Sequence, residues 1–276
     1  MRLGFRYRRA GNLDRILIPK RAEVARMLAG LPVRPRQRPK EGSLAALSRG
    51  PREGGAPLRL IAEIKLRSPS AGDLSRVLSP ADRALRYAAA GASMISVLTD
   101  APFFGGSFAD LAACREALDA ELGAARPFLL CKEFVLDPVQ LDRAVDAGAD
   151  AVLLIVRILE RGELPGLVRE AEARGLVPLV EVVTGAEMEQ ARAAGARLVG
   201  VNARDLNTLK MDAARAAEVL AGIEPSIVAV HLSGLRGPED VTRVAGSRAD
   251  AALIGEALMR QDDPTELLRA MVRAAE

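Results

Sequence analysis

Short apolar runs alternate with amphipathic segments along most of the chain. The apolar runs occupy residues 60–65, 93–98, 127–132, 151–156, 177–182, 197–202, 226–232 and 250–254. Runs of this length are typical of parallel strands that are buried on both faces. Between and after them, apolar residues recur at helical spacing near 80–90, 108–122, 137–147, 163–174, 185–194, 212–221, 237–245 and 264–275. The pattern predicts eight strands, each followed by a helix.

Glycine and proline mark the predicted boundaries. The tripeptide Ala-Gly-Ala stands where three helices should end, at 90–92, 147–149 and 194–196. Three helix starts carry a proline in their first turn, at Ser79-Pro80, Asp137-Pro138 and Gly237-Pro238. No hairpin turn interrupts the alternation, which predicts an α/β fold of the (β/α)8 TIM barrel type. The doubly wound alternative would need a glycine-rich dinucleotide turn after the first strand, and the sequence SPSAG at that point is not one.

An N-terminal segment precedes the alternation. Residues 1–12 are arginine-rich and aperiodic, which predicts a flexible extension, whereas a transit peptide would usually be longer and richer in serine. The next residues show helical spacing, interrupted near Pro19. Residues 29–59 are rich in proline, glycine and charge, with one helical turn near 44–47. We therefore expect a single barrel domain, 13–276, that includes an N-terminal helix and a long connection.

The composition favours a cytoplasmic globular protein. At 276 residues and 49% hydrophobic content, the chain can bury one large core. No apolar run approaches the roughly 18 residues of a membrane span, and no signal sequence opens the chain. Cys114 and Cys131 have no zinc spacing, which favours reduced thiols. With one histidine and no clustered ligands, we expect no bound metal.

Positive charge is concentrated near the N-terminus. The whole chain carries a net charge of +3, but residues 1–40 contain twelve Lys or Arg against only Asp14 and Glu23. The rest of the chain is therefore mildly acidic. Because the basic charge belongs to an N-terminal arm and not to the barrel, we expect no nucleic-acid partner.

Polar side chains stand at the ends of several predicted strands, where a barrel places its chemistry. In the first strand Ile61, Glu63 and Lys65 lie two apart and share the face that a closed barrel turns inward. Lys132 ends the third strand, and Glu181 lies within an otherwise apolar fifth strand. A buried charge without a partner is costly, so we interpret these residues as parts of a site. Taken singly, each would more often be a solvated charge.

Glycine turns and aromatic residues add a second set of candidates. Ser233-Gly234 and Gly255-Glu256 end the last two strands, where this fold binds phosphate through backbone N–H groups. Phe103 and Phe104 follow the second strand in a chain with only 3% aromatic residues. They predict either a packed loop or a wall against an aromatic substrate. Phe134 is a candidate for a second wall.

The motifs that carry these residues resemble those of the indole-3-glycerol phosphate synthase family. They occur in order as IAEIKLRSPSAG, SVLTDAPFFGGS, FLLCKEFVLD, ADAVLLIV, LVEVV, VGVNARDLNTLKMD and LSG followed by LIGEALM. The resemblance extends from about residue 13 to about residue 259. Seven motifs in order are specific, although none of them would be so alone.

The resemblance implies an enzyme of tryptophan biosynthesis. The implied reaction closes the ring of 1-(2-carboxyphenylamino)-1-deoxyribulose 5-phosphate and releases CO2 and water. It requires no cofactor. The expected partner is this small substrate, with no nucleic acid and no membrane, and the protein is expected to be a cytoplasmic monomer or weak homo-oligomer.

The resemblance also assigns roles to the candidate residues. Lys132 would be the general acid of ring closure, and Glu181 and Lys65 the base and acid of dehydration. Glu63 would orient the lysines, and Asn202 would hold sugar hydroxyls. The expected residues that bind the ring and the phosphate are Ser68, Phe104, Phe134, Leu153, Arg204, Ser233, Gly234, Gly255 and Glu256.

The chain departs from the family pattern at four positions. Leu232 stands where a glutamate usually precedes Ser-Gly, and Glu133 stands where an aspartate is common. Cys131 replaces an arginine and Ala257 a serine. His231 is not expected to take over from the missing glutamate, because strand parity turns it outward if Leu232 faces inward.

These departures leave two alternatives open. One is a non-catalytic or functionally drifted phosphosugar-binding barrel. The other is a different phosphosugar barrel enzyme, either an aldolase with a lysine Schiff base or an isomerase with a cysteine–aspartate pair.

Overall fold

The computed structural model describes residues 12–29, 46–49, 57–69, 72–205, 208 and 210–276. Among them, eight parallel strands form a closed barrel in the order β1-β10-β9-β8-β7-β6-β5-β4. The strands are β1 Arg59–Ile64, β4 Met94–Leu98, β5 Phe128–Lys132, β6 Ala151–Ile155, β7 Val177–Val182, β8 Leu198–Val201, β9 Val228–His231 and β10 Ala251–Ile254. The first strand closes the barrel by pairing with the last, with Arg59 opposite Ala251. The predicted (β/α)8 fold is confirmed.

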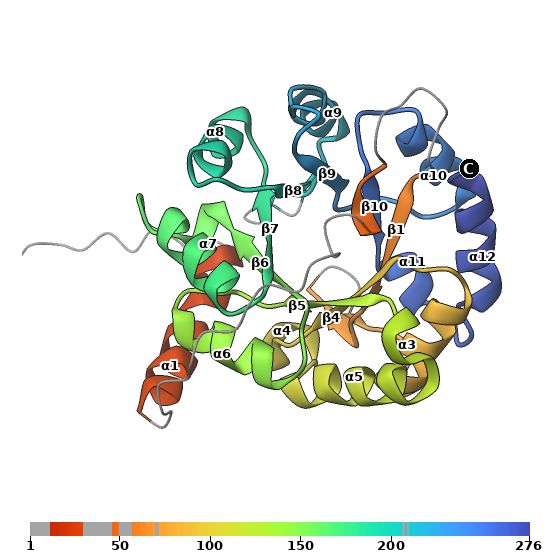
Figure 1. The fold of residues 1–276 in the computed structure, drawn as a ribbon, viewed down its shortest axis with the longest axis horizontal. Coiled ribbons are helices and arrows are strands. Elements are labelled where there is room, and N and C mark those ends of the chain that lie inside the picture. The colour runs from red at the N-terminus through yellow and green to blue at the C-terminus, as the bar shows by residue number, and fades with distance from the viewer. Residues whose placement is uncertain (1–11, 30–45, 50–56, 70–71, 206–207, 209) are drawn as a thin grey trace, which may run out of the picture.

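A helix follows each strand, and these helices surround the barrel in Figure 1. They are α3 Pro80–Ala89, α5 Phe108–Leu122, α6 Pro138–Asp146, α7 Leu164–Ala173, α8 Gly185–Ala193, α9 Ala213–Ala221, α10 Pro238–Ala245 and α12 Thr265–Ala274. Ser79 caps α3 through its side chain, and Asp137 forms a capping box at α6. The glycine of each Ala-Gly-Ala tripeptide has a positive φ, as the predicted helix ends require. None of the described helices is long and apolar enough to cross a bilayer.

Several short elements were not predicted. They are the strands β2 Arg67–Ser68 and β3 Gly72–Asp73, the helices α4 Ala101–Phe104 and α11 Glu256–Met259, and the 3-10 turns Gly123–Ala125 and Val156–Ile158. Elements of two to four residues are too short to show a period of apolar positions. All except Gly123–Ala125 follow the ends of strands, so they shape the C-terminal face, the end of the barrel at which the strands finish.

The two faces of each strand pack into different clusters. Ile61 on β1 belongs to the apolar cluster inside the barrel, together with Met94 on β4 and Leu130 on β5. Ala62 and Ile64, which alternate with Ile61, belong to the cluster between strands and helices. The alternation therefore turns Glu63 inward, as the sequence predicted.

The N-terminal helix α1 Asn12–Leu28 continues through Pro19, so the predicted interruption is wrong. A proline removes one backbone donor, but Leu13, Ile16 and Val24 are buried on one side of the helix, and this packing holds it together. Leu13 and Ile16 join the cluster inside the barrel, and α1 lies beside α6 in Figure 1. The predicted flexible extension lies outside the described residues except for Asn12, which begins α1.

Ala46 and Leu47 have helical conformation and lie near the end of the barrel at which the strands begin. Leu47 is fully buried in the inner cluster. Two residues later, Arg49 Nη1 donates to the carbonyls of Ala245 at 2.9 Å and Ala249 at 3.2 Å, just before β10 begins. The N-terminal segment therefore contributes apolar side chains at both ends of the barrel. Most of the predicted connection 29–59 lies outside the described residues.

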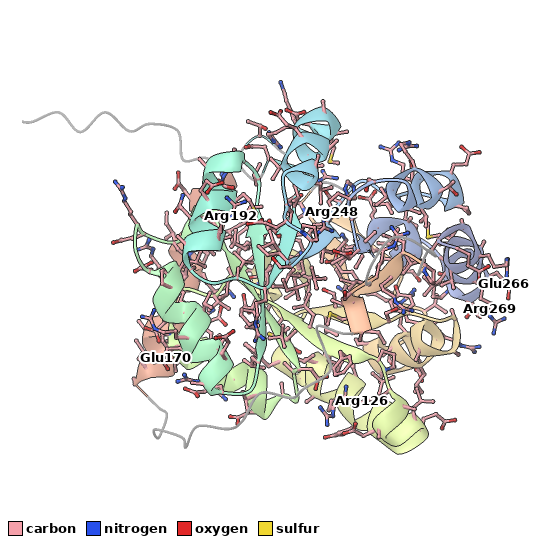
Figure 2. The ribbon with its side chains drawn as sticks, turned by 45° about the horizontal axis from the view of Figure 1, so that its top comes forward. Arg126, Glu170, Arg192, Arg248, Glu266 and Arg269 are labelled. Atoms are coloured by element: carbon pink, nitrogen blue, oxygen red, sulfur yellow. The ribbon has the colours of Figure 1, made fainter. Side chains whose placement is uncertain are left out.

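Arginine–aspartate pairs brace the N-terminal ends of two strands. Asp150, just before β6, accepts from the backbone N–H of Leu129 at 2.9 Å and from Arg126 at 2.7 and 3.0 Å. Asp250, just before β10, likewise accepts from the N–H of Ala229 and from Arg248. Figure 2 labels both arginines. These pairs lie at the end of the barrel away from the C-terminal face.

Candidate active site

The five predicted catalytic residues come from four strands and meet at the C-terminal face. Glu63 lies on β1 with Lys65 directly after it, and Lys132 ends β5. Glu181 lies on β7, and Asn202 directly follows β8. Ion pairs join Glu63 to both lysines, a hydrogen bond joins Asn202 to Glu181, and the charges of Lys132 and Glu181 act on each other across this cluster.

Glu63 holds two lysines side by side. Its Oε1 accepts from Lys65 Nζ at 2.8 Å, and its Oε2 lies 3.3 Å from Lys132 Nζ. Burial alone would raise the pKa of this carboxyl, but the charges of Lys132 and Lys65 outweigh it and lower the pKa to about 2. Glu63 is therefore a fixed negative charge throughout the neutral range.

Lys132 is kept protonated by its carboxylate neighbours. Burial lowers the pKa of a lysine, but here Glu63 and then Glu181 raise it above its usual value. The Lys132 side chain is 20% exposed. Ser96 on β4 lies opposite Glu63 in the strand between β1 and β5. Its small side chain leaves room for Lys132 to reach across that strand.

Glu181 is a buried carboxyl with a different environment. Burial raises its pKa, and the Lys132 charge and a hydrogen bond from Asn202 offset only part of this effect. Asn202 Nδ2 donates to Glu181 Oε1 at 2.8 Å. A carboxyl whose pKa is raised in this way accepts a proton more readily than an exposed glutamate, which suits a general base.

Asn202 is oriented by two donors. Its Oδ1 accepts from the backbone N–H of Arg204 and from Ser233 Oγ, each at 2.9 Å. With its oxygen held in this way, the amide nitrogen is directed at Glu181. The structure thus places the Ser233 hydroxyl against Asn202, although Ser233 was predicted to bind phosphate.

Gly255 lies against the charged cluster. A Cβ atom at this position would stand 2.5 Å from Glu63 Oε1 and 2.8 Å from Lys65 Nζ. Any side chain would therefore displace the Glu63–Lys65 pair. The backbone at the end of β10 approaches these side chains closely because residue 255 is glycine.

The region predicted to bind phosphate, around Gly234 and Glu256, lies next to Gly255 and the Glu63–Lys65 pair. Glu256 accepts from Arg260 at 3.1 and 2.8 Å, and these bonds, with smaller contributions from Lys65 and Arg204, lower its pKa. Lys65 and Arg204 therefore lie near the turn at the end of β10. Gly234 has a φ of 96°, which side-chain-bearing residues rarely adopt. Two cations and the glycine-containing turns make this a suitable place for an anion.

Two aromatic rings stand over the barrel mouth. The rings of Phe104 and Phe134 have centroids 6.0 Å apart and are tilted by 38°. They pack with Leu153 in the cluster inside the barrel. Ser68 is buried in the β2–β3 hairpin that follows β1. We call these two packed rings, Phe104 and Phe134, the aromatic wall; their contact with an aromatic substrate stays a prediction.

Leu232 faces the barrel interior, which meets the condition under which strand parity turns His231 outward. It belongs to the inner cluster and packs so closely on β8 that a Cβ on Gly200 would lie 2.4 Å from its Cδ1 atom. His231 alternates with it. Burial lowers the pKa of His231, and the side-chain charges that act on it are those of Arg243 and Asp240 on α10. His231 therefore faces the surrounding helices and takes no place in the cluster.

Sequence reasoning missed a buried lysine on α1. Lys20 is 1% exposed and lies 2.8 Å from Glu133 Oε1 and 3.0 Å from Asp100 Oδ1. One signal was available, because position 20 continues the buried positions 16 and 24 at helical spacing. A lysine on the apolar face of a helix indicates a buried partner.

The cysteines take no part in the cluster. Cys114 and Cys131 are buried among the apolar side chains between strands and helices, and burial raises the pKa of both thiols, that of Cys114 to about 12. This argues against an isomerase that uses a cysteine. Among the described residues, no group of three or more His, Cys, Asp or Glu side chains is arranged to hold a metal ion.

The fold and this cluster define a class of protein: (β/α)8-barrel enzymes with acid–base groups at the ends of the strands. The model of the family described as indole-3-glycerol phosphate synthase matches residues 13–271. The chain belongs to this family.

Named relatives agree with the family model. The indole-3-glycerol phosphate synthase of Saccharopolyspora erythraea is 44% identical over 215 residues, which cover 78% of this chain and 77% of the relative. Indole-3-glycerol phosphate synthase 1 of Streptomyces coelicolor is 40% identical over 270 residues, which cover 96% of each chain.

A solved structure resembles the chain in fold alone. The 3-hexulose-6-phosphate synthase of Salmonella typhimurium has a TM-score of 0.61 at 16% identity, and the match covers 79% of this chain and 98% of that one.

Proposed function

We propose that this protein catalyses the formation of indole-3-glycerol phosphate by ring closure of 1-(2-carboxyphenylamino)-1-deoxyribulose 5-phosphate, with loss of CO2 and water, in tryptophan biosynthesis. The observation that carries the proposal is the Glu63 carboxylate between Lys65 and Lys132, with the raised-pKa carboxyl of Glu181 in the same cluster. Membership of the family supports the choice of reaction.

Ring closure requires an acid. As the aromatic carbon attacks the substrate ketone, the developing oxyanion takes a proton, and Lys132 is the proposed donor. Glu63 keeps this lysine protonated and fixes its direction. Loss of CO2 then neutralises the charge on the ring.

Dehydration requires a base and a second acid. Glu181 is the proposed base, oriented by the amide of Asn202. Lys65 is the proposed donor to the departing hydroxyl, and its contact with Glu63 keeps it beside Lys132. The two lysines, held by one carboxylate, are thus assigned to successive proton transfers. Asn202 is also proposed to contact the sugar hydroxyls.

Binding is proposed to divide between two regions. Phe104, Phe134 and Leu153 would hold the aromatic ring and exclude water from the ketone. The phosphate and the adjoining sugar would lie against Ser68, Arg204, Ser233, Gly234, Gly255 and Glu256.

Leu232 is proposed to enlarge the apolar part of the site. Its packing against Gly200 fills the interior that a polar side chain would otherwise share with the substrate. We expect this to weaken contacts with polar substrate atoms while leaving both lysines and Glu181 in place. Both lysines and Glu181 are present in the chain, and a drifted, non-catalytic barrel would have no reason to keep them. Their presence supports the enzymatic interpretation over that alternative.

The test is to follow indole fluorescence after adding the linear substrate, with Lys132→Ala as the key variant. Loss of the ring-closing acid is expected to lower kcat by at least ~10²-fold with little change in stability. Arg269→Ala removes a half-exposed cation on α12, labelled in Figure 2, and serves as the matched control with unchanged kcat. Wild-type turnover by Lys132→Ala would remove this lysine from the mechanism. A wild-type protein that is inert, or that is trapped covalently by borohydride with a carbonyl substrate, would favour the alternatives.

The remaining expectations concern the state of the protein in the cell. We propose that it acts in the cytoplasm on its small substrate alone, without nucleic acid, as a monomer or weak homo-oligomer. Light scattering across a range of protein concentrations measures that state directly.

A further inference from the structure

The N-terminal helix carries one buried cation to the ends of two strands. Lys20 Nζ lies 2.8 Å from Glu133 Oε1, directly after β5, and 3.0 Å from Asp100 Oδ1, just after β4. The side chains of all three residues are 1% exposed. The third contact, Glu23 Oε2 at 2.8 Å, comes from α1 itself and is 30% exposed. Lys20 thus joins three segments that are far apart in the sequence.

Each of the two buried carboxylates also holds the backbone of an aromatic residue. Asp100 Oδ2 accepts from the N–H of Phe103 at 2.9 Å and caps α4, the turn that carries Phe104. Glu133 Oε1 accepts from the N–H of Phe134 at 2.7 Å. Phe134 is the next residue after Glu133, and Phe104 lies in the short helix that Asp100 caps. Both carboxylates contact Lys20.

The lysine is needed to keep these carboxylates together. Two buried carboxylates that share a site repel each other, and burial already raises the pKa of Glu133. The carboxylates of Glu133, Glu23 and Asp100 in turn outweigh burial at Lys20 and raise its pKa. Without the ammonium group, Asp100 and Glu133 would separate or one would take up a proton, and the backbone they hold would move with them.

We propose that Lys20 is a positioning residue for the aromatic wall: by binding Asp100 and Glu133 together, it sets the spacing of Phe104 and Phe134 and so the fit of the substrate's aromatic ring. The inference rests on the proposed function and adds α1 to the substrate-binding apparatus. Lys20 itself touches neither the reacting atoms nor the phosphate region near Arg204 and Gly255.

The test is Lys20→Met in the full chain. KM for the linear substrate is expected to rise at least tenfold, with a smaller change in kcat, because the wall contacts the ring before the chemical steps begin. The inhibition constant of inorganic phosphate is expected to stay within twofold, since the phosphate region lies at β9 and β10. Glu23→Gln, which removes the partly exposed contact and leaves both turns tied, is the matched control, with KM within twofold of wild type.

A double variant separates positioning from simple neutralisation of charge. In Lys20→Met/Glu133→Gln one buried charge is removed, while the glutamine oxygen still accepts from the N–H of Phe134. Tm is expected to recover in part, but KM is expected to stay at least threefold above wild type, because the ammonium group that joins Asp100 to position 133 is gone and only Thr99, beside Asp100, still contacts position 133. This variant also serves if Lys20→Met does not fold. KM at the wild-type value in either folded variant, or a parallel rise in the phosphate inhibition constant, would overturn the proposal.

Failure of the proposed function is seen separately, as absence of wild-type turnover. In that case the wall is tested by the binding of anthranilate, followed by its own fluorescence, since the chain contains no tryptophan. Weaker binding to Lys20→Met than to wild type supports the positioning role, and equal binding contradicts it.

Discussion

Glu63 and Glu181 are buried to the same extent, each 2% exposed, yet their pKa values are shifted in opposite directions. Two ammonium groups contact Glu63, whereas the contact of Glu181 is a neutral amide. The neighbours, and not the burial, therefore decide which carboxyl stays charged and which can exchange a proton. One barrel interior thus contains both a carboxylate that stays charged and a carboxyl whose pKa is raised.

The hydrogen bond from Asn202 gives a pH-dependent prediction. It favours the charged form of Glu181, so Asn202→Ala should raise the pKa of Glu181 further. A base works when deprotonated, so activity is lost as pH falls through its pKa. The acidic limb of the kcat/KM profile should therefore move to higher pH in this variant, in addition to any fall in the plateau. An acidic limb at the wild-type pH, or below it, would show that another group controls it.

For single residues, the sequence predicts those features that depend only on neighbours along the same strand or helix. Strand parity placed Glu63 inside the barrel, and His231 on the face opposite to that of Leu232, because alternation along one strand is a local property. Lys20 and Ser96 were not singled out, because their importance depends on neighbouring strands brought together only by the closed barrel. The contacts of Lys20 come from segments after β4 and β5.

Among the elements, strands and long helices were predictable to within about two residues. Each is a continuous apolar run or a helical stripe, bounded by capping residues and glycines such as Asp137 and Gly148. The short elements α4, β2, β3 and α11 were not predictable, since two to four residues are too few to show a period of apolar positions. Helix α1 differs for another reason: Pro19 predicts a break locally, and burial of the helix against the barrel overrides it.

The arginine–aspartate pairs that brace the strand starts separate stability from catalysis. Asp150→Ala removes a fully buried carboxylate and leaves Arg126 and the N–H of Leu129 without it. We expect the free energy of unfolding to fall by about 3 kcal/mol, as for other broken buried pairs. KM should be unchanged because the site is at the opposite end of the barrel. Urea unfolding and steady-state kinetics measure the two effects.

The control for this prediction is Arg269→Ala, whose pair with Glu266 is largely exposed. It is expected to change the free energy of unfolding by less than about 0.5 kcal/mol. If Asp150→Ala were as mild as this variant, the buried pair would not stabilise the strand starts. If it raised KM, the two ends of the barrel would not be independent.

For the whole molecule, the boundary of the N-terminal segment is testable by truncation. Residues 1–11 have no apolar periodicity, so removing them should leave kcat/KM and Tm nearly unchanged. Removing residues 1–28 takes away Leu13, Ile16 and Lys20, and both quantities should fall. Calorimetry and the indole assay on the two truncated chains measure the difference. A loss of several degrees in Tm on removing only 1–11 would show that the extension packs on the barrel.

Because the barrel closes between β1 and β10, it cannot be completed during synthesis until β10 has left the ribosome. One edge of β1 finds β4 soon after it leaves the ribosome, but the other pairs only with β10, near the end of the chain. At roughly 5–20 residues per second, that edge waits on the order of ten seconds or longer. An unpaired edge is a template for association with other chains. Until the last strand emerges, the nascent chain is therefore an open sheet with two exposed edges, and its final quarter turns an aggregation-prone intermediate into an edgeless barrel.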